Sequence, residues 1–307
     1  MKLFIIGNGF DCYLHGLPTK YSDFRKYILS RYPDAVECSY IPESTQMPDG
    51  EEVYDEKEAA GYIVNITDFC GGEEWSCLES YLGNDIYNRF LYDLPKVNLE
   101  YDDNQIWHDI YINEDMSNHI LNTFAGVKRL FEEWVREELA CLDMSEIRDE
   151  KVAEILEESA QYLVFNYTDT LQKVYHIDKS RICFIHGNAA DGSEIFFGHG
   201  DDEPIPETFE CMGTETAFDD LKRFLRKDTG KALENHMDFF RNLSDVDEIY
   251  SYGFSFSEVD RIYLEHICKY VDPANTVWYL GEYDWKEKPQ YKELLEKYGF
   301  TVKLVHI

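Results

Sequence analysis

The stretch KLFIIGNGFD at residues 2–11 decides the fold that this sequence predicts. Its apolar run, Leu3–Ile6, passes directly into Gly7–Gly9, and an acid follows at Asp11. A short run of continuous apolarity is typical of a strand covered on both faces, as in a parallel sheet. Glycines after such a strand permit positive φ angles and a close approach of the backbone to a ligand. The stretch therefore predicts a buried strand that ends either in an ordinary turn or in a phosphate-binding turn.

Apolar runs of the same kind recur along the chain and predict further strands. They lie at residues 162–165, 182–185, 195–197, 248–252, 276–280 and 301–305. Patterns with helical spacing lie between them, for example over 257–271, where Ser257 is a candidate N-cap. The alternation over 160–307 predicts an α/β fold with a doubly wound, mostly parallel, Rossmann-like sheet.

The sequence between the first strand and residue 160 interrupts this alternation. Its long helical patterns contain too much helix for a single crossover connection. We therefore expect a core formed by residues 1–33 and 160–307, with a helical insertion at 34–159. A smaller helical insertion is expected at 200–243, within the core.

The charge balance excludes several classes of partner. The 307 residues include 61 Asp plus Glu against 29 Lys plus Arg, which gives a net charge of −32. A surface of this sign repels polyphosphate and anionic lipid, so neither nucleic acid nor a membrane is expected as a partner. No run of the sequence reaches the ~18 apolar residues that a membrane span needs.

The eight cysteines do not form a C-x-x-C pair, which removes the usual spacings of zinc and redox sites. No metal is therefore expected. Free thiols, together with an N-terminal apolar run too short for a signal peptide, favour a cytoplasmic protein.

In a sheet of this type, ligands bind beyond the carboxyl ends of the strands, near the point where the strand order reverses. The residues at the end of the first strand are Gly7, Asn8, Gly9, Phe10 and Asp11. The two glycines can face a phosphate, and Asp11 can bond a ribose hydroxyl. Cys12 occupies the place of the third glycine in the G-x-G-x-x-G dinucleotide fingerprint. The alternative is a strand-to-helix turn with Asp11 as a cap.

Asn166 follows the apolar strand in VFNYTDTL, where its amide can bond a sugar hydroxyl or fix a water molecule. The alternative is an Asx-turn, with Thr168 or Asp169 capping a helix that starts at Thr170. A helix that already has two candidate caps does not need a third, which favours a functional role for Asn166.

His186 stands at the next strand end, in ICFIHGNA. Histidine exchanges a proton near neutral pH and can act as a general base toward a hydroxyl. The alternative is a core histidine with its hydrogen bonds satisfied. His199, in FFGHGDD, competes for the same role but lies among turn residues and acids, so His186 ranks first.

The fourth strand end is YSYGFSFSEVD, in which Gly253 ends the strand and Ser255 and Ser257 offer hydroxyls. Free amides at the start of the following helix suit a ribose or a phosphate. The alternative is an approximate capping box made by Ser257 and Asp260.

Together these blocks resemble the AbiH family of bacterial phage-defence (abortive infection) proteins. The resemblance is carried by IIGNGFDCYLHGLPTKYSDF (5–24), FNYTDTLQKVY (165–175), IHG (185–187), IFFGHG (195–200) and YGFSFSEVD (252–260). In the first block, Cys12-Tyr13 interrupts the more usual short link between the Asp and the His-Gly. The resemblance implies a role in anti-phage defence, with a phage-derived trigger or a second copy of the chain as a partner.

More distantly, the order of the blocks is similar to that of sirtuin-like NAD-consuming domains. The similarity implies that Asn166 and His186 correspond to that family's catalytic Asn and His. It also implies that Asp169, one position later than the family spacing, lies at the site. It further implies that Gly7 and Gly9 face the pyrophosphate of the dinucleotide. Gly253 and Ser255 would then contact the adenosine ribose.

The resemblance implies NAD as the substrate. The cysteine-ligated zinc module of protein-deacetylating sirtuins has no counterpart in the sequence, which favours simple hydrolysis of the bond between nicotinamide and ribose. The alternative is a sensor that binds a small-molecule nucleotide, NAD or ADP-ribose, without chemistry.

Overall fold

The computed structural model of the chain describes residues 1–205 and 211–305. The chain forms two compact units, each built from separate segments of the sequence. Unit 1 comprises Met1–Lys20, Val135–Phe196 and Asp228–Ile307. Unit 2 comprises Tyr21–Trp134 and Phe197–Lys227.

Unit 1 holds a parallel sheet, which has six strands within the described residues, in the order β5-β4-β1-β6-β7-β8. The strands are β1 Lys2–Ile6, β4 Gln161–Val164, β5 Ile182–Phe184, β6 Glu248–Tyr252, β7 Val277–Gly281 and β8 Thr301–Val305. Numbered by their sequence in the chain, they follow the 3-2-1-4-5-6 order of a doubly wound nucleotide-binding sheet. The predicted Rossmann-like α/β fold is confirmed.

Helices and helical turns of unit 1 connect these strands. They are η1 Phe10–Leu14, η3 Leu139–Cys141, α7 Glu150–Ile155, α8 Thr170–Tyr175, η4 Lys179–Arg181, α10 Thr229–Asn235, α11 Met237–Arg241, α12 Arg261–Tyr270, η6 Pro273–Asn275, α13 Glu282–Glu287 and α14 Pro289–Lys297. The element η1 is a π-helical turn that follows β1 directly.

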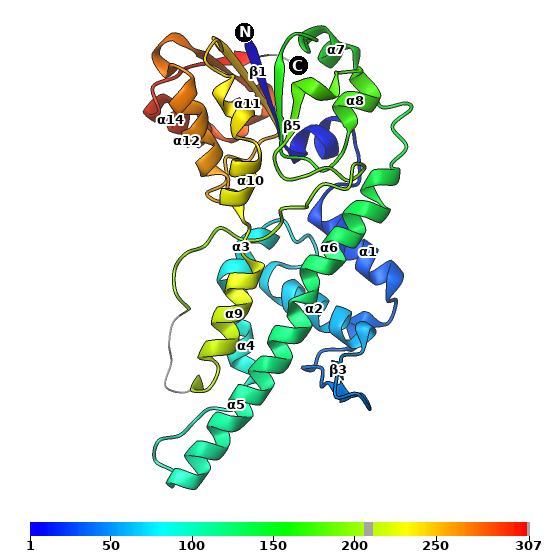
Figure 1. Cartoon of the computed structure of the whole chain (residues 1–307), viewed down its shortest axis with the longest axis vertical. Coiled ribbons are helices and arrows are strands. Elements are labelled where there is room, and N and C mark those ends of the chain that lie inside the picture. Colours follow the sequence, from blue (N-terminus) through cyan, green and yellow to red (C-terminus); the bar gives the residue numbers. More distant parts are fainter. Residues whose placement is uncertain (206–210, 306–307) are drawn as a thin grey trace. The chain divides into compact units, whose positions relative to one another are not determined.

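Both faces of the sheet are covered, which explains the unbroken apolar run of β1. Leu3 and Ile5 pack in one core with side chains from α10, α11, α12 and α14. Phe4 and Ile6 pack in the core of the opposite face, with side chains from η1, α7 and α8. Figure 1 shows these helices around the sheet. A strand whose two faces are both buried needs an apolar residue at every position.

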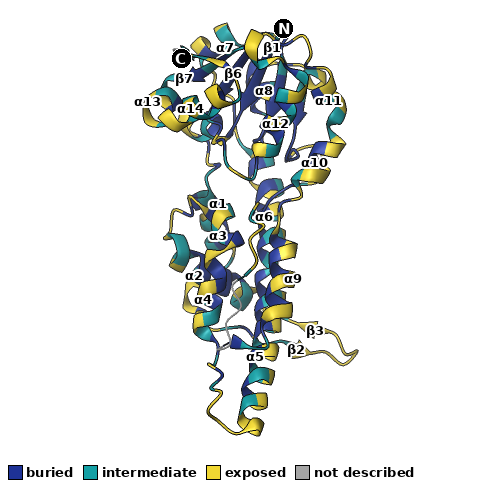
Figure 2. Cartoon of the chain, turned by 90° about the vertical axis from the view of Figure 1, so that its left-hand side faces the viewer, coloured by how far each residue is buried: buried dark blue, intermediate teal, exposed yellow. Residues whose placement is uncertain are grey.

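Unit 2 consists, within the described ranges, of helices and one short hairpin, β2 (Thr45–Gln46) with β3 (Glu52–Val53). Figure 2 shows this hairpin as exposed. The helical elements are α1 Tyr21–Arg31, η2 Ala35–Glu37, α2 Glu56–Gly71, α3 Leu78–Gly83, α4 Asp85–Asp93, α5 Asp103–Phe124, α6 Gly126–Glu137, whose last three residues belong to unit 1, and α9 Glu215–Leu225.

Aromatic side chains form much of the core of unit 2. The ring of Phe90 contacts that of Phe124 edge-on at 5.2 Å, and the rings of Phe131 and Phe197 stack at 3.8 Å between centroids. Asp55 and Asp102 cap α2 and α5 by accepting hydrogen bonds from first-turn amides. Buried aromatic area and satisfied helix ends together stabilise a helical unit of this size.

The predicted helical segments can be followed in the structure. The range 34–159 contains α2 to α7, and the range 200–243 contains α9, α10 and α11. Residues 206–210 of the second range lie outside the described residues. None of the helices within 1–205 and 211–305 has the length and apolarity needed to cross a membrane.

The strand predicted at 195–197 was wrong, because these residues have no regular secondary structure. Their apolarity reflects burial: Phe196 lies in the core of unit 1 and Phe197 in that of unit 2. The Phe196 amide donates to the His186 carbonyl, and the Phe196 carbonyl accepts from the Tyr167 hydroxyl. Individual hydrogen bonds thus pair the polar groups of this backbone without the regular pairing of a β-sheet.

The strand order reverses between β1 and β6, and the turns that follow these two strands pack directly on each other. The Gly7 amide donates to the Tyr252 carbonyl at 2.9 Å, and the Gly9 amide donates to the Gly253 carbonyl at 3.1 Å. A Cβ atom on Gly253 would lie 2.4 Å from the Cα atom of Gly9, and Gly253 has a φ of +61°. Close backbone contact therefore requires glycine here.

We predict that Gly253→Ala lowers the free energy of unfolding by roughly 2–5 kcal/mol, because left-handed strain adds to a steric clash. The matched control is Gly192→Ala, since Gly192 has a φ of +74° but nothing within 4 Å of the added Cβ. The free energy of unfolding of the control should fall only by the cost of the left-handed conformation, roughly 1–2 kcal/mol. Urea unfolding of both variants measures the difference. Equal losses would show that the contact between the two turns does not constrain position 253.

Candidate functional site

The carboxyl edge of the sheet in unit 1 carries two clusters of buried polar side chains. The first is centred on the Asp11 carboxylate in η1, which is 0% exposed. Its Oδ2 atom accepts hydrogen bonds from the Asn166 amide nitrogen at 2.9 Å and from the Thr168 hydroxyl. Its Oδ1 atom accepts from the Thr170 hydroxyl at 2.8 Å. One carboxylate therefore joins the turn after β1 to the end of β4 and the start of α8.

Burial raises the pKa of Asp11 to about 6, although the hydrogen bonds from Thr168, Thr170 and Asn166 act in the opposite direction. Removal from water disfavours the charged form of a carboxyl group, and three donors recover only part of that cost. The Asp11 carboxyl group therefore changes its charge close to neutral pH.

Asn166 presents one polar atom that the Asp11 cluster does not satisfy. Its side chain is 4% exposed, and its Nδ2 atom is fixed by Asp11. Its Oδ1 atom is buried and has no hydrogen-bond partner within the described part of the chain. A buried amide oxygen without a partner is uncommon and can accept a hydrogen bond from a hydroxyl or from water. The geometry suits the sugar or water contact predicted for Asn166.

The second cluster is centred on His186, which follows β5 and is 3% exposed. Its Nε2 atom lies 3.3 Å from the Asp260 Oδ1 atom, and Asp260 is also buried. The Ser257 hydroxyl donates to the Asp260 Oδ2 atom at 2.9 Å. The His186 ring packs edge-on against Phe165 at 5.1 Å and lies 5.6 Å from the Tyr263 ring. A carboxylate this close to an imidazole can orient the ring.

The two clusters belong to opposite faces of the sheet. The Asp11 cluster is built on η1 and α8, which cover the face containing Phe4. His186 instead contacts Phe165 and Tyr263, which pack in the core of the other face. β4 and β5 are neighbours in register, so Asn166 and His186 come from adjacent strand ends. A ligand that used both side chains would lie across the carboxyl edge.

The other residues predicted at the first turn take structural positions. The Asn8 amide donates to the Thr19 carbonyl at 2.8 Å. Phe10 is buried, with its ring centroid 4.6 Å from that of His15. Gly7 and Gly9 pack on Gly253, as described above. The structure thus accounts for these glycines by backbone packing, and a role at a pyrophosphate stays a prediction.

The remaining candidates differ in exposure and partners. Asp169 precedes α8 and pairs with Lys173 at 3.1 Å rather than capping the helix with its side chain. Ser255 is exposed. Ser257 is not the N-cap predicted for it, because α12 begins only at Arg261 and the Ser257 hydroxyl bonds Asp260 instead.

His199 belongs to unit 2, where it is 1% exposed. Its Nδ1 atom accepts from the Asp201 amide at 3.1 Å, so its Nε2–H donates to the Lys222 carbonyl at 2.8 Å. Burial lowers the pKa of His199, in keeping with this neutral tautomer. Both ring nitrogens are occupied, which indicates a structural histidine.

Sequence reasoning missed four polar side chains at this edge of the sheet. Thr168 and Thr170 were considered only in relation to the start of a helix, yet both hydroxyls donate to Asp11. Asp260 was considered only as part of a capping box, yet it pairs with His186. Asp284 in α13 is hydrogen-bonded by the Gly253 backbone, and burial raises the pKa of Asp284 to about 6. Only the pairing of distant segments reveals these contacts.

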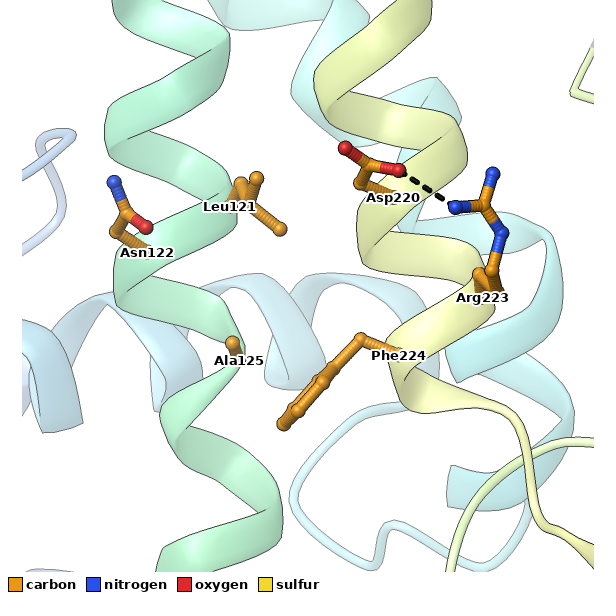
Figure 3. A pocket seen from close by; sticks show the side chains of 6 residues that line it. All are labelled: Leu121, Asn122, Ala125, Asp220, Arg223 and Phe224. Carbon is orange, nitrogen blue, oxygen red and sulfur yellow. Dashed lines mark hydrogen bonds and ion pairs between the residues drawn. The ribbon is translucent and has the colours of Figure 1, made fainter.

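Two surface pockets lie away from these clusters. A shallow pocket of about 480 Å³ in unit 2 lies between α5 and α9. Figure 3 shows its lining residues, Leu121, Asn122, Ala125, Asp220, Arg223 and Phe224. A second pocket, of about 430 Å³, lies at the amino end of β1, beside Lys2 and Glu248. Within 1–205 and 211–305, no three His, Cys, Asp or Glu side chains are grouped as a metal ion requires.

The sheet order and the buried polar clusters at its carboxyl edge define an α/β protein of the doubly wound class. The family described as bacteriophage abortive infection AbiH matches residues 3–281. The chain therefore belongs to the AbiH family, and the family supports a role in phage abortive infection. No curated protein and no solved structure matches the chain.

The raised pKa of Asp11 predicts how protein stability changes with pH. Folding raises this pKa from an ordinary 3.8 to about 6, so the folded state binds the proton more tightly. The resulting stabilisation is complete below pH 3.8 and is lost as the pH rises through 6. Between pH 4.5 and 7.5, the free energy of unfolding of wild type should therefore fall by on the order of 2 kcal/mol more than that of Asp11→Asn.

Urea unfolding at several pH values measures this difference, because the other carboxylates are common to both proteins and cancel. Asp238→Asn, on the exposed surface of α11, is the matched control and should run parallel to wild type. If the free energy of unfolding changed with pH in the same way in wild type and Asp11→Asn, the raised pKa of Asp11 would be contradicted.

Proposed function

We propose that the protein acts in phage defence by hydrolysing NAD to nicotinamide and ADP-ribose. The observation that supports this best is the pair of polar groups at adjacent strand ends. One is the Asn166 amide, held by Asp11 with its oxygen unpartnered within the described residues. The other is the His186 imidazole, 3.3 Å from Asp260. The similarity of the sequence blocks to sirtuin-like domains supplies the choice of NAD.

The reaction needs little covalent chemistry from the protein. The bond between the ribose C1 carbon and the nicotinamide nitrogen breaks, and its electron pair neutralises the pyridinium. Water then attacks the oxocarbenium-like carbon and loses a proton. The Asn166 oxygen would hold that water or a ribose hydroxyl, and His186 would bond a ribose hydroxyl or accept the released proton. Asp260 would hold the imidazole and stabilise its charge.

Burial of both groups bears on how substrate reaches them. Asn166, His186 and Asp260 are each at most 6% exposed. A substrate must therefore move part of the carboxyl edge before it contacts these side chains. A resting form closed in this way suits a defence enzyme acting in the cytoplasm, since constant hydrolysis of NAD would harm the cell that carries it. We propose that infection supplies the trigger.

The test compares wild type with His186→Ala and Asn166→Ala. Loss of a general base or of substrate positioning lowers kcat about 100-fold or more. Release of nicotinamide is measured with purified protein, and the NAD content is measured in phage-infected cells that carry each variant. In infected cells, and in purified form once an extract of infected cells supplies the trigger, wild type should consume NAD, and both variants should fail to do so while remaining folded.

His108→Ala is the matched control, because His108 is an exposed histidine of α5 in unit 2. It should retain the full activity. Protection of infected cells by wild type without any fall in NAD would refute the proposal, as would full hydrolysis by both site variants.

A non-catalytic nucleotide sensor is the second candidate, favoured by the same burial. Side chains that are enclosed and hydrogen-bonded in the resting form can report a ligand by rearranging, without chemistry. This candidate predicts that intact NAD or ADP-ribose raises the melting temperature of the protein and that no nicotinamide appears.

A further inference from the structure

Two exposed tyrosines lie face to face at the carboxyl edge of the sheet in unit 1. Tyr13 belongs to η1, after β1, and Tyr283 belongs to α13, after β7. Tyr13 is 72% exposed and Tyr283 is 62% exposed. Their ring centroids lie 6.2 Å apart, with 24° between the ring planes. Single exposed aromatics are ordinary, but near-parallel rings from segments this distant in sequence form a defined surface.

The tyrosine pair is attached to the same turns that carry the buried polar groups. Tyr13 stands two residues after Asp11, whose carboxylate fixes Asn166. Tyr283 directly precedes Asp284, which is hydrogen-bonded by the Gly253 backbone. The outward rings therefore share short, rigid connections with the buried cluster below them. A molecule seated on the rings therefore lies at the same carboxyl edge of the sheet as Asn166 and His186.

A cation adjoins the pair, in a chain that is otherwise strongly acidic. The Lys20 Nζ atom lies over the Tyr13 ring, 4.7 Å from its centroid. The net charge of the chain is −32, so a positive group at this edge opposes the general field. An ammonium group beside an aromatic face suits a ligand that combines a planar ring with a phosphate.

The spacing of the rings suits a planar aromatic ligand. A base inserted between two rings needs about 7 Å, twice the ~3.5 Å contact distance of carbon atoms. The 6.2 Å separates the ring centroids and not the ring planes, so a base enters between the rings only after the side chains rotate, and both residues are at exposed positions where they can do so. A base can also stack on the Tyr283 ring alone, whereas the Lys20 ammonium covers one face of Tyr13. Stacking of this kind binds any base, because every base has a π-face.

We propose that Tyr13 and Tyr283 bind the nucleobase of an adenine nucleotide by stacking, with Lys20 beside its phosphate. The choice of adenine rests on the proposed function, whereas the stacking of a nucleobase rests on the rings alone. The tyrosines act in binding and leave the chemistry to the buried groups.

The test uses AMP as the probe and ribose 5-phosphate, which lacks the base, as its comparison. Titration calorimetry measures both ligands on wild type, Tyr13→Ala, Tyr283→Ala and the double variant. AMP affinity should fall about tenfold for each single variant. Ribose 5-phosphate should bind equally to all four proteins. Tyr13→Phe and Tyr283→Phe should retain AMP binding, because they keep the ring.

Tyr101→Ala is the matched control, since Tyr101 is 53% exposed and belongs to unit 2. It should bind AMP as wild type does. The proposal is overturned if AMP binds wild type no more tightly than ribose 5-phosphate does, or if the double variant keeps wild-type affinity.

Failure of the two proposals can be told apart. His186→Ala should keep AMP binding, and the tyrosine variants should raise KM for NAD more than they lower kcat. Ring-dependent AMP binding without NAD hydrolysis would support the base site and refute the enzymatic proposal. NAD hydrolysis that is unchanged in both tyrosine variants would support the enzymatic proposal and refute the base site.

Discussion

A buried carboxylate holds the carboxyl edge of this protein together. Asp11 is enclosed completely, and it accepts hydrogen bonds from one amide and two hydroxyls that lie more than 150 residues away in the chain. Burial of a charge without partners would cost more free energy than the net folding stability of a typical domain. The three donors make the arrangement tolerable, and the raised pKa records the cost that they do not offset. The turn after β1, the end of β4 and the start of α8 are thus fixed as one unit.

This arrangement explains why the acid of the first motif, Asp11, is not exposed. A strand-to-helix turn that only needed a cap could leave Asp11 at the surface, where water would solvate it. Instead, η1 directs Asp11 inward and Tyr13 outward. The outcome is an amide at Asn166 with one end fixed and the other end unpartnered within the described residues. Fixing a polar group while leaving one of its atoms available is the arrangement expected of a binding position.

The fold could be predicted from the sequence because the central strands β1, β4 and β6 are short, largely apolar and mostly buried. The runs at 248–252 and 301–305 coincide with β6 and with the edge strand β8. The apolar run at 195–197 failed because burial in a loop gives the same pattern as burial in a strand. The candidate site was predictable only in part. Asn166 and His186 are visible as polar residues at strand ends, whereas the pairing of His186 with Asp260 joins segments over 70 residues apart.

The acidic composition bears on how such an edge would meet an anionic nucleotide. A net charge of −32 slows the approach of any phosphate, and salt screens that repulsion only beyond about 10 Å. Binding then depends on local groups such as the Lys20 ammonium beside Tyr13. Stacking on aromatic rings adds affinity without charge, so it is little affected by the field of the chain. An acidic protein that binds a nucleotide gains most from contacts with the base, and the exposed tyrosines stand where such contacts would form.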